Sequence, residues 1–350
     1  MNMNNINIED RIIGKDHPLF IIAEAGVNHN GSIDIAKKLV DEAANAGADA
    51  IKFQTYKSEN VVSNNVKSAD YVKQNLGKEI DQKSLLKKYE LKYDDFKILK
   101  NYCDTKNIIF LSTPHSFDAI DFLEPLVPAY KFGSGDITNI PSLVYAASKG
   151  KPLIIGTGMS TLDEVKRAVK EIKKTGNQQI ILLHCTTSYP CPIEQVNLNA
   201  MKTMQKELGC LVGYSDHTLD TLVPVIARSM GAVILEKHFT LDRGQPGPDH
   251  KASLEPVELK KMVQDVRRAE IILGSNIKKP TDDEEKIKKI VRKSIVAGTD
   301  IEKGTIIKEN MFSYKRPGTG INPSEINKLI ARKAKRKISE NELIDLNMIE

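Results

Sequence analysis

The chain has 350 residues, of which 40% are hydrophobic and 28% charged, a composition typical of a folded globular protein. Its 51 basic and 46 acidic side chains leave a formal net charge of only +5, which gives no reason to expect a nucleic-acid partner. The length fits one large α/β domain with a small additional domain better than two equal domains.

Neither a membrane segment nor a disulfide framework is predicted. No apolar run approaches the roughly 20 residues needed to span a bilayer, and the first 14 residues lack the layout of a signal peptide. The four cysteines, Cys103, Cys185, Cys191 and Cys210, have no CxxC spacing. This pattern predicts reduced thiols and a cytoplasmic protein. Cys185, at the end of a hydrophobic run, is expected to fill core or line a pocket.

Eight hydrophobic runs are expected to form strands, and each is followed by a stretch with helical spacing. The runs are almost continuously apolar, as parallel strands are when both faces are buried. Eight such units in about 260 residues match the size of a TIM barrel, so we predict an α/β fold with a (β/α)8 barrel. The expected strands are residues 19–26, 48–55, 108–114, 129–135, 152–158, 180–186, 210–216 and 232–239.

The chain is expected to divide into a barrel (1–275), a charged linker (276–290) and a small module (291–350). Within the module, TDIEKGTIIKENM (299–311) and RKISENELIDLNM (336–348) match at four positions, which suggests a pseudo-symmetric, β-rich fold. A long lysine-rich segment (56–83) follows the second strand. It is interpreted as a lid or a surface excursion.

Two histidines at strand ends carry the strongest chemical signal. His217 lies two residues after Ser215, and His238 lies two residues after Glu236. Side chains two apart on a strand share a face, and active sites of TIM barrels lie at the carboxyl ends of the strands. Two imidazoles at neighbouring strand ends are suitable ligands for a catalytic divalent cation that keeps other positions open.

The other strand ends also carry polar side chains. Lys52 and Lys131, with nearby hydroxyl groups, form a receptor for a phosphate or carboxylate group. A strand-end lysine could instead form a Schiff base, but the histidine pair favours metal chemistry. His17 and His115 lack such support and are interpreted as incidental. The remaining candidates are Glu24, Gln54, Thr113, Ser134, Asp136, Tyr189 and Asp249.

In combination, several motifs resemble the sialic acid synthase family, which includes N-acetylneuraminate and legionaminate synthases. They are AEAGVNHNG, KFQT, FLSTP, YKFGSGD, HCTTSYP, GYSDHT, EKHFTLD, GPDHKASLEP and KRPGTGI, spread over residues 15–350. The resemblance implies a TIM barrel joined to a C-terminal antifreeze-like domain (a SAF domain of β-clip fold). It also implies a homodimer in which the C-terminal domains are swapped.

The resemblance further implies roles for individual residues. His217 and His238 would bind Mn²⁺ or Mg²⁺, and Glu24 and Asp136 would act in catalysis with them. Phosphoenolpyruvate would be held by Lys52, Thr113, Lys131, Ser134 and Ser215. The amino sugar would contact Gln54, Tyr189, Asp249 and Arg316 of the partner subunit. Where many relatives have serine after the fifth strand, this chain has Gly156.

Several functional hypotheses follow. The first is the condensation of phosphoenolpyruvate with N-acetylmannosamine to N-acetylneuraminate and phosphate. An alternative acceptor, 2,4-diacetamido-2,4,6-trideoxymannose, would give N,N'-diacetyllegionaminate. Other enzyme hypotheses are a metal-dependent barrel aldolase or a ketodeoxy-sugar-phosphate synthase. These would need a second cationic pocket for the phosphate of the acceptor. A non-enzymatic reading is an ice-binding or interaction protein that acts through the C-terminal domain.

Overall fold

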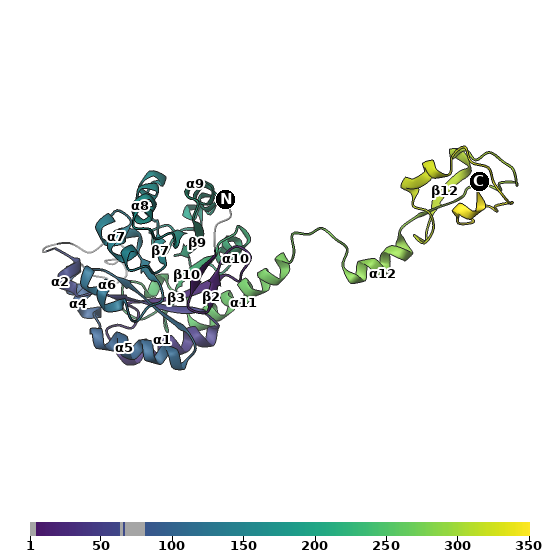
Figure 1. Cartoon of the computed structure of the whole chain (residues 1–350). Helices are drawn as coiled ribbons and strands as arrows, with labels where there is room; N and C mark the ends of the chain where they lie inside the picture. Colours follow the sequence, from purple (N-terminus) through teal and green to yellow (C-terminus); the bar gives the residue numbers. More distant parts are fainter. Residues whose placement is uncertain (1–4, 64–65, 67–80) are drawn as a thin grey trace. The chain divides into compact units, whose positions relative to one another are not determined.

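A computed structural model describes residues 5–63, 66 and 81–350 (Figure 1). Two compact units, Met1–Gly274 and Ser275–Glu350, make up the chain. Most of the segment 56–83, predicted as a lid or excursion, lies outside the described residues. Within the described part of the chain, every helix is too short or too polar to cross a lipid bilayer.

The first unit is built on eight parallel strands, and each predicted run contains one of them. They pair in the order β5-β4-β3-β10-β9-β8-β7-β6, and β5 and β6 lie side by side, so that the sheet forms a nearly closed barrel. The predicted TIM-like barrel is therefore confirmed. The strands are β3 (Phe20–Gly26), β4 (Ala50–Thr55), β5 (Ile109–Pro114), β6 (Tyr130–Phe132), β7 (Leu153–Gly156), β8 (Ile180–His184), β9 (Leu211–Asp216) and β10 (Ile234–His238).

Helices surround the strands (Figure 1). Their boundaries follow local capping: the Ser32 hydroxyl accepts a hydrogen bond from the Ile35 amide at the start of α1, and Gly47 ends this helix with φ of 83°. The surrounding helices are α1 (Ile33–Ala46), α5 (Tyr93–Thr105), α6 (Phe117–Leu123), α7 (Ile140–Ser148), α8 (Leu162–Lys174), α9 (Asn199–Leu208), α10 (Leu222–Ser229) and α11 (Pro256–Leu273). Two shorter helices between β4 and α5 are α2 (Ser58–Val61) and α4 (Gln82–Tyr89).

An N-terminal hairpin, β1 (Ile6–Ile8) and β2 (Arg11–Ile13), was not predicted from the sequence. Its isoleucines Ile6, Ile8 and Ile13 join one buried cluster with barrel residues such as Ile22 and Leu111. The cluster consists of alternate residues of the strands, as expected for side chains that point into a barrel. The hairpin thus completes the apolar interior of the barrel.

The second unit begins with α12 (Asp282–Val291), which covers most of the expected linker. Its fold contains an antiparallel pair, β11 (Ser294–Ala297) and β12 (Phe312–Lys315). The two repeated segments bridge each other at Ile301 and Ile338, and each ends in a 3-10 turn, η4 (Glu309–Met311) and η6 (Leu346–Met348). The isoleucines shared by the two repeats are buried in one core. The sequence repeat therefore corresponds to repeated structure.

Candidate active site

Alternate side chains of each strand point into the barrel, and those at the carboxyl ends of the strands are polar. On β9, apolar Leu211 in the interior cluster is followed, at steps of two, by Gly213, Ser215 and His217. On β10 the same alternation leads from Ile234 to Glu236 and His238. The side chains at the carboxyl ends line a cavity of about 230 Å³. This is the end of the barrel where the sequence predicted a site.

Most of the predicted residues line this cavity. From β3, β4 and β5 come Glu24, Lys52, Gln54 and Thr113. From β6, the loops after β6 and β8, and the chain beyond β10 come Lys131, Ser134, Tyr189 and Asp249. From β9 and β10 come Ser215, His217 and His238.

Two predicted residues are placed elsewhere. Asp136 belongs to a 3-10 turn, η1 (Ser134–Asp136), and among the described residues it is not part of the cavity wall. Burial raises the pKa of Asp136 to about 6, although the Lys131 ammonium opposes this effect. Arg316 belongs to the second unit, where it is exposed and its Nε donates to the carbonyl oxygen of Val291 at 3.0 Å.

Several residues without a predicted role also line the cavity. His115, interpreted as incidental, follows β5 directly and lines the cavity. Its ring lies edge-on to that of Tyr56, with centroids 5.9 Å apart. Glu236 and Cys185 line the cavity as well. The two-residue spacing had placed Glu236 on the same face as His238, and Cys185 was expected to fill core or line a pocket.

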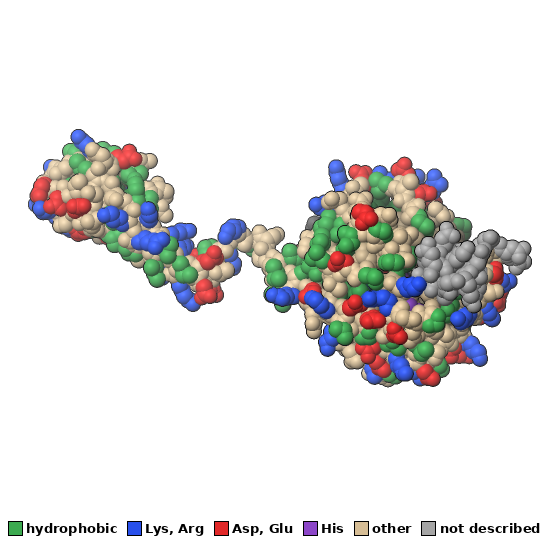
Figure 2. Space-filling view, turned by 180° about the vertical axis from the view of Figure 1, so that it is seen from behind, with side chains coloured by type: hydrophobic (Ala, Val, Ile, Leu, Met, Phe, Trp, Pro, Cys, Tyr) green, Lys and Arg blue, Asp and Glu red, His purple; other side chains and the backbone are tan. Residues whose placement is uncertain are grey.

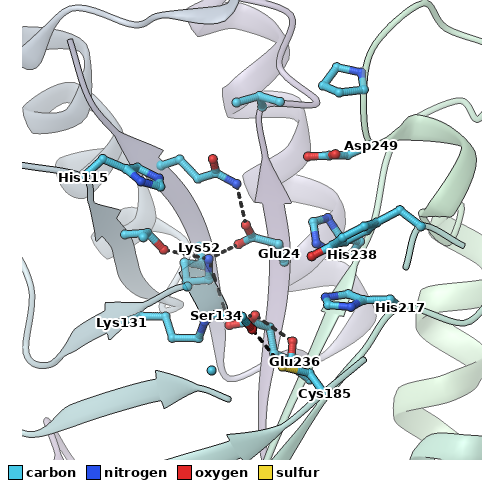
Figure 3. A pocket seen from close by; sticks show the side chains of 18 of the residues that line it. Glu24, Lys52, His115, Lys131, Ser134, Cys185, His217, Glu236, His238 and Asp249 are labelled. Atoms are coloured by element: carbon cyan, nitrogen blue, oxygen red, sulfur yellow. Dashed lines mark hydrogen bonds and ion pairs between the residues drawn. The ribbon is translucent and has the colours of Figure 1, made fainter. Parts of the chain in front are cut away.

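A buried network centred on Lys52 crosses the middle of the pocket (Figure 3). Lys52 Nζ lies 2.6 Å from Glu24 Oε2 and donates to Thr113 Oγ1 at 3.0 Å. Gln54 Nε2 donates to the other oxygen of Glu24 at 3.2 Å. Burial raises the pKa of Glu24 to about 7, an effect that Lys52 opposes and the negative charge of Glu236 reinforces. Glu24 can therefore accept or release a proton near neutral pH.

Glu236 lies between the two pocket lysines. Its Oε1 is 3.3 Å from Lys131 Nζ and accepts from Ser215 Oγ at 3.0 Å, and its Oε2 is 4.0 Å from Lys52 Nζ. Burial opposes ionisation of Glu236, but Lys131 and Lys52 outweigh it and lower the pKa of this carboxyl to about 2. Glu236 is thus a permanent anion that holds two ammonium groups in place.

His217 and His238 face each other across one side of the pocket, with ring centroids 5.5 Å apart. Burial lowers the pKa of both imidazoles, so both are neutral at physiological pH. His217 Nδ1 donates to the carbonyl oxygen of Thr186 at 2.6 Å, which leaves the lone pair of its Nε2 available. His238 Nδ1 is buried without a hydrogen-bond partner in the described structure.

These properties fit a divalent cation held by two imidazoles, with further positions for water or substrate. A ring of three or more His, Cys, Asp and Glu side chains at metal-binding distance does not occur among the described residues.

Ser134 and Cys185 form a hydroxyl–thiol pair at the end of the pocket that also contains Lys131 (Figure 3). Their Oγ and Sγ atoms are 3.0 Å apart, and the Gly158 amide donates to both, at 3.0 and 3.1 Å. A Cβ atom at Gly156 would lie 3.0 Å from Ser134 Oγ. Ser134 thus fills the space that a side chain at position 156 would need, which accounts for glycine there.

Comparisons with known proteins agree with this fold. Residues 39–278 match the NeuB family and residues 292–350 match the SAF domain. The chain is 46% identical over 331 residues, 93% of each chain, to the N,N'-diacetyllegionaminic acid synthase of Legionella pneumophila. It is 36% identical to the human N-acetylneuraminate-9-phosphate synthase, over 97% of this chain and 95% of the human one.

A solved structure is similar as well. The N-acetylneuraminic acid (sialic acid) synthetase of Leptospira borgpetersenii, determined in complex with citrate, superimposes with a TM-score of 0.73 at 37% identity. The match covers 81% of this chain and 95% of that one. The chain belongs to the NeuB family, as an enzyme of the synthase type joined to a SAF domain.

Proposed function

We propose that the chain is a nonulosonic acid synthase that joins phosphoenolpyruvate to the aldehyde of an N-acetylated amino sugar. C3 of phosphoenolpyruvate bonds to the aldehyde carbon, whose oxygen becomes a hydroxyl group. Water adds to C2, and the C2–O bond to phosphate breaks to leave a 2-keto acid. One observation carries the proposal: two buried lysines and two neutral histidines converge with Glu24 on one cavity.

Phosphoenolpyruvate would bind at the end of the pocket that contains Lys131 and Ser134. Lys131 now pairs with Glu236 at 3.3 Å and also donates to the carbonyl oxygen of Phe132 at 3.0 Å. A phosphate or carboxylate oxygen can replace that carbonyl as an acceptor and gain a charge-assisted hydrogen bond. Lys52, Thr113 and Ser215 would donate to the remaining oxygens.

Glu24 would move the protons. With a pKa near 7, it is partly ionised at physiological pH and can take a proton from the water that adds to C2. Its neighbours fix its orientation, since Lys52 and Gln54 each contact one of its oxygens. The carboxylate also suits the positive charge that develops at C2 during carbon–carbon bond formation.

His217 and His238 would hold Mn²⁺ or Mg²⁺. When bound, the cation supplies Lewis-acid polarisation of the sugar's aldehyde. The chain's own contribution is to keep both imidazoles neutral and oriented: burial suppresses their protonation, and the Thr186 carbonyl fixes the tautomer of His217. Titration of Mn²⁺ into the protein, followed by calorimetry, would test this site independently of turnover.

The acceptor would occupy the opposite end, near Asp249. Gln54 and Tyr189, which also line the cavity, would contact it. Relatives support different sugars: the Legionella relative is named for N,N'-diacetyllegionaminic acid and the Leptospira relative for N-acetylneuraminic acid. The first name supports a 2,4-diacetamido-2,4,6-trideoxy acceptor and the second N-acetylmannosamine. In the described part of this chain, the lysines and arginines that line the cavity are Lys52 and Lys131, and phosphoenolpyruvate would use both.

We also propose that the enzyme is a homodimer in which Arg316 of the partner subunit contacts the sugar. Arg316 is exposed on the second unit. Large apolar side chains are also exposed, including Leu222 on α10 and Ile271 and Ile272 near the end of α11. Figure 2 shows hydrophobic side chains on the barrel unit beside the point where the chain leaves it. Such exposure is typical of surfaces that a partner covers.

The test is phosphate release from phosphoenolpyruvate in the presence of Mn²⁺ and a panel of amino sugars. We expect release that depends on an unphosphorylated N-acetylated amino sugar, with the 2-keto acid formed in equal amount. Release only with a phosphorylated acceptor, or release without any sugar, would contradict the proposal.

A further inference from the structure

The cavity has an apolar wall at the end where the sugar would bind. Val27, in the loop after β3, and Leu85 and Leu86, on α4, line it together with Pro248. Pro248 precedes Asp249, which lies at the opposite end of the pocket from Lys131 (Figure 3). The phosphate-binding end is therefore lined by cations and hydroxyl groups, whereas the acceptor end includes hydrocarbon.

The inner part of this wall is packed into a cluster of its own. Val27 and Leu85 are each 5% exposed and are packed with Tyr56 and Tyr89, both 2% exposed. Leu86 is partly buried against the same cluster. Since the tyrosines support these side chains from behind, the wall cannot withdraw without opening a void.

The backbone of α4 is also held in place. Tyr56 OH donates to the carbonyl oxygen of Leu86 at 3.2 Å, and Asp81 caps the start of the helix. A Cβ atom at Gly31 would lie 2.8 Å from the carbonyl oxygen of Lys88, so the loop after β3 packs directly against the helix. The wall is thus formed before any ligand binds, which is the condition for selective binding.

We propose that Val27, Leu85, Leu86 and Pro248 select acceptor sugars that carry apolar substituents, and so favour a 2,4-diacetamido-2,4,6-trideoxyhexose over N-acetylmannosamine. The inference rests on the proposed function. The two sugars differ at C4, where the first has an acetamido group and the second a hydroxyl, and at C6, where a methyl group replaces a hydroxymethyl. Transfer of these methyl groups from water to the apolar wall lowers the free energy of binding.

Hydroxyl groups against the same wall would weaken binding of the sugar. The side chains of leucine, valine and proline offer no hydrogen bond, so a hydroxyl pressed against them gives up its water without a replacement. A change of a single methylene in an apolar pocket alters selectivity by roughly 10- to 200-fold. Burial of methyl groups and desolvation of hydroxyl groups therefore both favour the trideoxy sugar.

The experiment measures kcat/KM for both sugars at saturating phosphoenolpyruvate, in wild-type enzyme and in Leu86→Asn. Asparagine keeps the branching and the number of side-chain heavy atoms of leucine but adds hydrogen-bonding groups. We expect the wild type to prefer the trideoxy sugar, and the ratio of the two kcat/KM values to fall at least about tenfold in the variant. The KM for phosphoenolpyruvate should stay within a factor of about two, because Lys131 and Ser134 lie at the other end.

Ile98→Asn, on α5, is the matched control. Ile98 is 45% exposed and is not part of the cavity wall, so the same change there should leave the ratio unaltered. If Leu86→Asn fails to fold, judged by its thermal midpoint, Val27→Thr introduces a hydroxyl group at nearly constant volume and should shift the ratio in the same direction.

Two results would overturn the inference alone: a wild type that prefers N-acetylmannosamine, or a folded, active variant with an unchanged ratio. A wild type that releases phosphate with neither sugar would overturn the proposed function, and the inference with it.

Discussion

Strand β10 contributes two neighbouring side chains, Glu236 and Lys237, to two buried ion pairs on opposite sides of the barrel wall. Asp216 and Lys237 occupy outward-facing positions, and both are fully buried. Lys237 Nζ contacts Asp216 Oδ2 at 2.6 Å and donates to the carbonyl oxygens of Thr218 and Asp220 at 2.5 and 3.2 Å. Every proton of this ammonium group has an acceptor within the protein.

The inward-facing pair, Glu236 and Lys131, is satisfied less completely. Among the described residues, Glu236 Oε2 has no hydrogen-bond partner, and neither does the buried Nδ1 of His238 beside it. Glu24 Oε2 has only the Lys52 ion pair. Because unmet polar atoms are costly when buried, the contrast indicates a structural role for the outward pair and a ligand-binding role for the inward one.

The largest expected effect is a difference in stability and ligand binding between two lysine-to-methionine variants, one for each ion pair. Lys237→Met leaves Asp216 charged and buried, and should lower the free energy of unfolding by about 3–5 kcal/mol. Lys131→Met should cost less stability, because Glu236 keeps Ser215 and Lys52, but should abolish phosphoenolpyruvate binding. Urea unfolding of both variants, with calorimetric titration of phosphoenolpyruvate, measures the contrast. Equal losses of stability would contradict it.

His238→Ala should reduce turnover at least about a hundredfold, since Lewis-acid assistance is worth several kcal/mol. Its thermal midpoint should change little, because His238 Nδ1 makes no hydrogen bond that the fold would lose. The measurement is phosphate release together with Mn²⁺ affinity, determined by calorimetry. Retained Mn²⁺ affinity in this variant would refute the assignment of the metal site.

Arg316→Ala should raise the KM for the sugar by roughly tenfold, because one hydrogen bond to a charged group is lost. Binding of phosphoenolpyruvate should stay near normal. Mixing this variant with His217→Ala tests whether the arginine acts on the partner subunit. In a mixed dimer, one site would combine an intact pocket with an intact arginine. Recovered activity after subunit exchange is expected, and no recovery would count against the swapped arrangement.

The smallest effect concerns pH. With the pKa of Glu24 at about 7, the ionised form that accepts a proton is lost as pH falls, so kcat/KM should drop about tenfold per unit below pH 7. Glu24→Gln should remove this limb together with most of the activity. Asp136→Asn, a buried carboxyl outside the cavity wall, should keep it. A profile that is flat between pH 5.5 and 8 in the wild type would exclude Glu24 as the base.

Much of the barrel and its site could be predicted because they follow from local patterns. Continuous apolar runs identified the eight strands, and a spacing of two placed Ser215 with His217 and Lys52 with Gln54 on interior faces. The same rule placed Glu236 on the face of His238, and it explains why its sequence neighbour Lys237 points away.

Other parts depend on contacts between distant segments. Leu85 and Leu86 follow a long polar stretch and reach the pocket only because Tyr56 and the loop after β3 hold α4 there. His115 lies one residue beyond β5, where the two-residue period of a strand no longer predicts which way a side chain points. The N-terminal hairpin is only three residues per strand and is stabilised by the barrel interior rather than by its own propensity.

Calorimetric titration of phosphoenolpyruvate into the wild-type enzyme and Lys131→Met, both with Mn²⁺ and without sugar, tests the central claim most directly. The account predicts saturable binding to the wild type and none to the variant. No binding to the wild type, or equal affinity for the two proteins, would show that the inward-facing charges are not a phosphoenolpyruvate site.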